Sequence, residues 1–110
     1  MTEFDPDKIR ERLAQVGDEW ADKKAAFEAL DDLTKTVLAE VMSNHLPGCA
    51  TKAEAEMRSL MDPTYKQHLA DKAAARRAWL KAEVVWKTGS TWAELRRSQE
   101  STLREQMRIR

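Results

Sequence analysis

Apolar residues recur at alternating steps of four and three along the first part of this chain, between Ile9 and Val41. This spacing places them on one face of a helix and is typical of the heptad seam along which two helices pack. The seam positions are Ile9, Leu13, Val16, Trp20, Lys23, Phe27, Leu30, Thr34, Val37 and Val41. Lys23 and Thr34 are polar, and we expect them to fix the packing register, as buried polar residues do in coiled coils. The spacing predicts one long helix that pairs with another helix.

The composition favours an all-α fold and a single domain. Among 110 residues there are only 3 glycines and 3 prolines, while 35% of the residues are charged. Such a composition is typical of long helices that each keep one face in water. Chains of this length rarely hold two independent cores. We therefore expect one helical domain over residues 1–110.

The first helix has recognisable ends. Asp5 stands before Pro6, which is the arrangement of a capping carboxylate followed by a proline at the first helical position. Pro47 cannot continue a helix, so the first helix is predicted to end at about Asn44. Gly17 is an interior weak point, because glycine has a low helix propensity.

A short second helix is predicted at the connection. Thr51 and Glu54 have the spacing of a capping box, in which two side chains satisfy backbone N–H groups at a helix start. The helix should run from about residue 52 to residue 61. Asp62 and Pro63 then repeat the capping pattern and open a third helix.

The third helix has two alternative lengths. It would end near Trp86 if Thr91 and Glu94 formed a further capping box. It would continue to about Arg108 if the heptad spacing, which crosses Gly89 without a slip, governs the fold. We favour continuity, with Gly89 admitting a bulky side chain from the partner helix. Either way, we predict a long antiparallel helical hairpin, coiled-coil-like, of two long helices and one short helix.

The sequence lacks the residue patterns of an enzyme or a metal site. His45 and His68 are the only histidines, and neither has a second ligand at a recognised metal spacing. A helical hairpin of this length also offers no cleft in which a nucleophile, a base and an oxyanion site could be aligned. We therefore expect no catalytic residue, no metal and no cofactor.

The expected location is the cytoplasm. Cys49 is the only cysteine, so one chain has no disulfide framework and a reducing compartment is favoured. No apolar run approaches the roughly 18 residues of a membrane-spanning helix. Residues 1–5 lack the basic-then-apolar order of a signal peptide. We expect no membrane partner.

The net charge of zero conceals two halves of opposite sign. The first 55 residues carry 12 acidic and 7 basic side chains, whereas the last 55 carry 7 acidic and 12 basic ones. In one interpretation the acidic first helix and the basic last helix pair along their length. In the other, part of the basic half remains available to an anionic partner such as nucleic acid. The charge pattern is compatible with both.

Tryptophan and arginine are concentrated in the second half of the chain. Aromatic rings among arginines are typical of surfaces that bind single-stranded nucleic acid, where bases stack on rings and phosphates meet guanidinium groups. The same residue types occur in protein-interface hot spots. Alternatively, the tryptophans fill a helix-pair core opposite Trp20 and Phe27. The candidate residues for binding nucleic acid or a partner are Arg76, Arg77, Trp79, Trp86, Trp92, Arg96, Arg97 and Arg104.

The second half of the chain also resembles a known group of proteins. Residues 65–69 read Tyr-Lys-Gln-His-Leu, residues 73–76 read Ala-Ala-Ala-Arg, and residues 96–108 form an Arg-, Ser- and Glu-rich run that ends in Met107 and Arg108. In this order they resemble small uncharacterised helical proteins encoded in the early, DNA-metabolism regions of tailed phages and prophages. The resemblance implies a role near phage recombination or replication, but it implies no defined activity and no site residues.

Two functions follow as hypotheses. The first is a non-catalytic accessory protein of phage or prophage DNA metabolism that binds single-stranded DNA or a recombination or replication protein. The second is a helical protein–protein interaction module, an assembly adaptor or an inhibitor of a host defence complex, with no nucleic-acid binding. In both, we expect a homodimer, because the apolar seam and the Trp-rich face present more apolar surface than one hairpin can bury.

Overall fold

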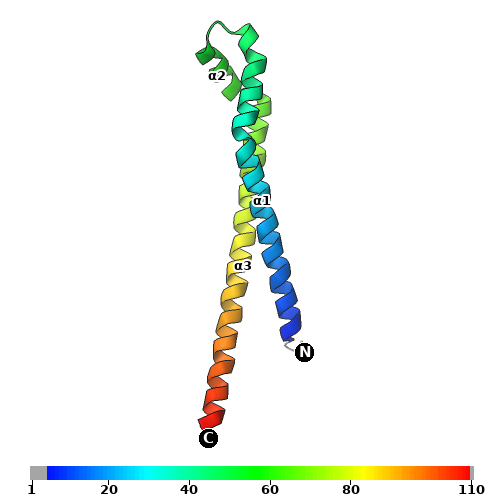
Figure 1. Ribbon diagram of the computed structural model, residues 1–110, viewed down its shortest axis with the longest axis vertical. Helices are drawn as coiled ribbons and strands as arrows, with labels where there is room; N and C mark the ends of the chain where they lie inside the picture. Colours follow the sequence, from blue (N-terminus) through cyan, green and yellow to red (C-terminus); the bar gives the residue numbers. More distant parts are fainter. Residues whose placement is uncertain (1–4, 110) are drawn as a thin grey trace. The chain divides into compact units, whose positions relative to one another are not determined.

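The computed structural model describes residues 5–109, which form helices joined by short connections (Figure 1). Helix α1 spans Pro6–His45, the 3₁₀ helix η1 spans Leu46–Gly48, α2 spans Lys52–Leu60 and α3 spans Pro63–Ile109. No strand is present among these residues. The fold is an all-α hairpin of two long helices with a short helix at the connection, and the predicted fold class is confirmed.

The described residues divide into two compact units. The turn unit contains residues 22–79, which are the later part of α1, η1, α2 and the start of α3. The terminal unit contains residues 5–21 with the start of α1 and residues 80–109 of α3. Each unit has its own contacts between α1 and α3.

Local hydrogen bonds explain where the short helix and α3 begin. Thr51 Oγ1 accepts a hydrogen bond from the Glu54 backbone N–H at 3.2 Å. The Glu54 carboxylate accepts one from the Ala50 N–H, also at 3.2 Å, so the predicted capping box forms with Ala50 as its second donor. Asp62 Oδ1 caps α3 by accepting from the Thr64 N–H at 2.8 Å.

In the turn unit, α1 and α3 run antiparallel, because later residues of α1 meet earlier residues of α3. The Phe27 and Trp79 rings stack with centroids 5.4 Å apart. Further along α1, Thr34 Oγ1 lies 3.0 Å from Nε2 of His68. The Thr34 hydroxyl donates its single proton to the Leu30 carbonyl oxygen at 3.1 Å, so it accepts from His68. Thr34 is thus a polar seam residue with a partner on the facing helix.

The other polar seam residue expected from the sequence, Lys23, does not belong to the seam. Its side chain is exposed, whereas the neighbouring Lys24 is half-buried. A straight helix has 3.6 residues per turn and drifts by about 20° per heptad from a strict 3.5-residue repeat. A charged amine also remains in water at the edge of a seam more readily than it enters the core. The prediction that Lys23 helps to fix the register is therefore wrong.

In the terminal unit, both interior glycines receive side chains from the facing helix. A Cβ atom at Gly17 would lie 2.6 Å from Nε1 of Trp86, and one at Gly89 would lie 2.8 Å from Cδ2 of Leu13. The Trp86 ring also stacks on Trp20, with centroids 5.2 Å apart. Gly17, which the sequence marks only as a weak point, is the position that lets α1 approach this ring.

Helix α3 continues through Gly89 without a break, as the favoured alternative predicts. The capping box of Thr91 and Glu94 does not form a new helix start, because both residues lie inside α3. Leu13 is the bulky partner that Gly89 admits. Close packing of the two helices at Gly89 therefore outweighs the low helix propensity of glycine.

Ion pairs lie both between the helices and within them. Lys72 Nζ lies 2.8 Å from Asp31 Oδ1 and links α3 to α1 in the turn unit. Further ion pairs lie within one helix and join Glu54 to Arg58, Glu83 to Lys87, Glu100 to Arg104 and Glu105 to Arg108. Exposed pairs of this kind are each worth about 0–1 kcal/mol.

Candidate binding surfaces of the terminal unit

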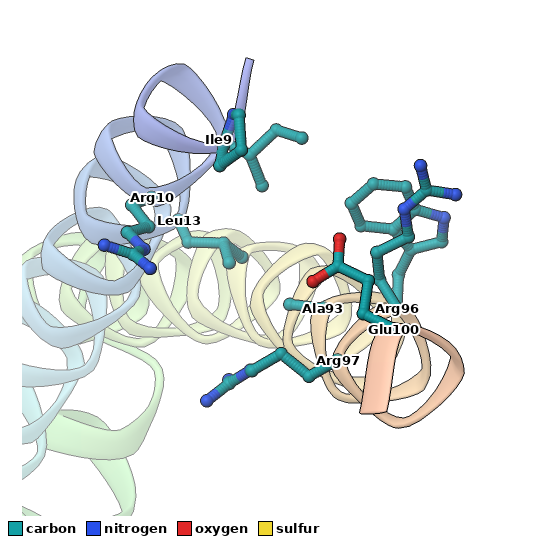
Figure 2. A pocket seen from close by; sticks show the side chains of 9 residues that line it. Ile9, Arg10, Leu13, Ala93, Arg96, Arg97 and Glu100 are labelled. Atoms are coloured by element: carbon teal, nitrogen blue, oxygen red, sulfur yellow. The ribbon is translucent and has the colours of Figure 1, made fainter. Parts of the chain in front are cut away.

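A groove lies between the first turns of α1 and the later part of α3 in the terminal unit (Figure 2). Its volume is about 330 Å³. The residues that line it are Pro6, Ile9, Arg10, Leu13, Trp92, Ala93, Arg96, Arg97 and Glu100. Helix α1 thus contributes mainly apolar side chains, and α3 contributes most of the charged ones.

Helical spacing explains how these side chains reach the groove. On α3, Ala93, Arg97 and Glu100 follow one another at steps of four and three, which keeps them on the face that meets α1. Figure 2 shows the Arg96 and Arg97 side chains pointing to opposite sides of α3, with the Glu100 carboxylate directed into the space between the helices. Ile9 projects from α1 toward the same space. The groove therefore has an apolar floor and a charged rim.

The rim has an excess of positive charge. It carries the guanidinium groups of Arg10, Arg96 and Arg97 and the single carboxylate of Glu100. Arginine stays protonated throughout the physiological pH range. Glu100 also lies 3.9 Å from Arg104, a highly exposed side chain on the next turn of α3. The groove is suited to a ligand with negative charge and an apolar part.

Two of the three candidate tryptophans pack inside the helix pair. Trp79 stacks on Phe27 in the turn unit, and Trp86 stacks on Trp20 in the terminal unit. This agrees with the alternative in which the rings fill the core opposite those two residues. Trp92 differs, because it is 47% exposed, and it lines the groove.

The candidate arginines fall into separate places. Arg76 and Arg77 are exposed on the turn unit. Arg96 and Arg97 line the groove of the terminal unit. Arg104 does not line it, but its guanidinium group lies 3.9 Å from the carboxylate of Glu100, which does. The structure therefore brings Trp92, Arg96 and Arg97 together, while Arg76, Arg77 and Trp79 lie outside the groove.

Sequence reasoning missed the contribution of α1 and of Glu100 to this groove. The heptad spacing places Ile9 and Leu13 in the seam and does not mark Arg10 as a candidate. A signal was present: beyond Ala93 the seam-facing positions of α3 become charged, at Arg97 and Glu100. Charged residues at such positions indicate that close helix packing ends there.

A second surface lies on the outer side of α3. The uncharged residues Val84, Thr88, Thr91, Leu95, Ser98 and Thr102 recur at steps of four and three, and all of them are exposed. We call this row the outer seam. Two shallow hollows run along it, one lined by Lys87, Thr88, Thr91, Trp92 and Leu95 and the other by Leu95, Ser98, Gln99, Thr102 and Leu103.

Large apolar side chains on and beside the outer seam are strongly exposed. Val84 is 65% exposed and Leu95 60%. Val85 and Leu103, which flank the row, are 55% and 58% exposed. Isolated exposed apolar residues are common, but these four lie along one side of α3, where apolar residues gathered together mark an interaction surface.

The two histidines have structural partners. His68 is buried and bonds Thr34. His45 Nε2 donates to Asp62 Oδ2 at 2.7 Å, which links the end of α1 to the cap of α3. This bond and the Thr64 backbone N–H lower the pKa of Asp62 from its ordinary value. Both histidines join α1 to the start of α3.

No metal site, membrane-spanning helix or similar known protein points to a function for the described residues. Within residues 5–109, no three His, Cys, Asp or Glu side chains gather closely enough to hold a metal ion. Over the same residues, no helix has the length and apolarity needed to span a membrane. Comparison with protein-family models, curated proteins and solved structures found no match. The function is therefore inferred from the chain's own surfaces.

Proposed function

We propose that this protein is a non-catalytic helical interaction module, an assembly adaptor that docks helix to helix through the outer seam of α3. The observation that supports this proposal is that the six residues of the outer seam combine heptad spacing, absence of charge and exposure. A heptad row without charge is what a helix presents to another helix. Burial of Val84 and Leu95 in the row, with Val85 and Leu103 beside it, would contribute about 25 cal/mol per Å² of apolar surface.

The outer seam faces away from α1. Ala93 lines the groove beside α1, and Trp86, seven residues earlier, lies on the same face of α3. Successive residues of a helix are about 100° apart, so Leu95 lies about 200° around α3 from Ala93. Helix α1 therefore leaves the outer seam uncovered, and a helix from another molecule has room to dock there.

The simplest partner is a second copy of the chain, which would make the homodimer expected from the sequence. Melting temperature tests it, because association stabilises the folded state in a concentration-dependent way. We expect the melting temperature to rise with protein concentration for the unmodified chain. Leu95→Glu places a charge in the outer seam and should abolish this dependence.

Leu33→Glu is the matched control. Leu33 is 49% exposed on α1 in the turn unit and is not part of the outer seam. This variant should keep the concentration dependence of the unmodified chain. If both variants behave alike, the outer seam is not the self-association surface.

The second candidate function is binding of single-stranded DNA by an accessory protein of phage-type DNA metabolism. One observation favours it: the exposed Trp92 ring lines the same groove as Arg96 and Arg97. A ring beside guanidinium groups suits base stacking with phosphate contact. The sequence resemblance to early-region phage proteins supports the same role.

Oligothymidylate binding tests this candidate, with tryptophan fluorescence as the readout at two salt concentrations. Replacing Arg96 and Arg97 with Gln removes two charges from the groove, and replacing Arg76 and Arg77 with Gln removes the same charge elsewhere. If DNA binds in the groove, only the Arg96 and Arg97 replacements should weaken the affinity. Equal weakening would indicate diffuse polyanion binding, and the absence of binding at low salt would remove the candidate.

A further inference from the structure

We propose that the groove of the terminal unit binds an acidic protein segment through one apolar side chain and its neighbouring carboxylates. The apolar side chain would pack on Ile9, Leu13 and Ala93. The carboxylates would meet the guanidinium groups of the rim. The groove lies on the side of α3 that faces α1, and Trp92 borders both the groove and a hollow of the outer seam.

The floor of the groove is apolar. Ile9 and Leu13 are half-buried and come from consecutive turns of α1, and Ala93 of α3 completes the floor. The volume of about 330 Å³ lies at the small end of the range of about 300–1,000 Å³ in which proteins bind small ligands. A groove of this size accommodates one or two side chains of a partner rather than a folded surface.

The rim of the groove is positively charged and complements an acidic ligand. Arg10, Arg96 and Arg97 surround the floor, and Glu100 is the one acidic residue among the lining side chains. Guanidinium groups bind carboxylates through paired, charge-assisted hydrogen bonds. An uncharged apolar ligand would gain nothing from this positive charge, and a basic ligand would be repelled. The partner must therefore be both acidic and apolar.

The floor favours a protein segment over the single-stranded DNA of the second candidate function, which would occupy the same groove. Bases bind best between or against aromatic rings, but Ile9, Leu13 and Ala93 are aliphatic, and Trp92 is the one ring in the groove. The Glu100 carboxylate points into the groove, where it would repel a continuous phosphate backbone. A peptide can place an apolar residue over this carboxylate and its acidic residues beside the arginines.

A set of fluorescein-labelled peptides tests the proposal on the full-length chain. Each is a short run of Asp and Glu with one Leu, Phe or Trp at its centre. Control peptides replace the apolar residue with Ser or the acidic residues with Asn and Gln. We expect at least one of the acidic peptides with an apolar residue to bind about tenfold more tightly than both of its controls.

Substitutions in the protein show whether the peptide binds in the groove. Arg96→Gln combined with Arg97→Gln should weaken peptide binding about tenfold, whereas the matched pair at Arg76 and Arg77 should change it less than about twofold. Glu100→Gln should strengthen binding severalfold, because it removes a repelling charge from the groove. A purely structural role of Glu100 would not produce this gain.

Three results would overturn the proposal. One is that no peptide of the set binds at low salt. Another is that Ser in place of the apolar residue leaves the affinity unchanged, which would show plain charge attraction. The third is that oligothymidylate of equal charge binds more tightly than the peptides and loses affinity with the Arg96 and Arg97 replacements. The concentration dependence of melting is measured separately, so failure here is distinguishable from failure of the outer-seam proposal.

Discussion

At the scale of single residues, the interior glycines show how side-chain identity sets the approach of two helices. Gly17 and Gly89 both lie where a side chain of the facing helix would collide with a Cβ atom. At Gly17 the neighbour is the ring of Trp86, which is held by its stack on Trp20. At Gly89 the neighbour is a terminal methyl group of Leu13, which can move by rotating a single bond.

This difference predicts opposite outcomes for the same substitution. Ala is favoured over Gly in a helix by about 1 kcal/mol, and Gly89→Ala should keep part of that gain. Gly17→Ala should lower the free energy of unfolding by about 1–3 kcal/mol, because the rigid ring cannot yield. Urea unfolding measures both. Equal stabilisation by the two substitutions would show that the Trp86 ring does not pack against Gly17.

The Thr34 and His68 hydrogen bond gives a second prediction at this scale. Thr34→Val keeps the shape of the side chain but leaves the buried His68 ring without its partner, which should cost about 1–3 kcal/mol. Thr36→Val, two residues along and exposed, is the matched control and should change stability by less than about 0.5 kcal/mol. An equal effect of both in urea unfolding would contradict a role for this bond.

At the scale of elements, local signals were sufficient to predict the helices. The first long helix ends at His45, one residue beyond the predicted Asn44. The short helix ends at Leu60, one residue before the predicted end. Prolines and capping residues act on their own neighbours, so their effect can be read without knowing the fold. The continuity of α3 was also predictable, because its heptad spacing crosses Gly89.

The groove and the exposure of Lys23 could not be predicted in the same way. The groove depends on the distance between α1 and α3 at each position along the helices. The exposure of Lys23 depends on how far the helix face drifts from the heptad repeat. The sequence shows that Arg97 and Glu100 are charged, but only the fold shows that Ile9 faces them. For the same reason, the sequence did not decide which tryptophan is exposed.

The junction between α1 and α3 carries a pH-dependent contribution to stability. The hydrogen bond from His45, with the Thr64 N–H, lowers the pKa of Asp62 in the folded protein. A lowered pKa means that the stabilisation is present above the ordinary carboxyl pKa of about 3.9. It is lost as the pH falls through the folded-state value.

Asp62→Asn tests the direction of this pH dependence, because asparagine remains a good helix cap but cannot ionise. The unmodified chain should be more stable than the variant at neutral pH. The difference should shrink as the pH is lowered below about 4. Urea midpoints across this pH range measure it, and a difference that does not vary with pH would contradict the contribution of the Asp62 charge.

At the scale of the whole molecule, the balance of charge separates two modes of self-association. The acidic half of one copy could attract the basic half of another, or the uncharged outer seams could pack together. Attraction between exposed charges is screened within about 8 Å at physiological salt, whereas burial of apolar surface is not weakened by sodium chloride. We therefore expect the dimer to withstand salt.

Sedimentation equilibrium of the unmodified chain, over a range of concentrations at low and high sodium chloride, is the most direct test of the outer-seam proposal. We expect a mass that rises with concentration from 12.6 kDa towards twice that value. We expect the same rise at both salt concentrations. A mass of 12.6 kDa at every concentration, or a dimer that dissociates at high salt, would contradict the outer-seam proposal.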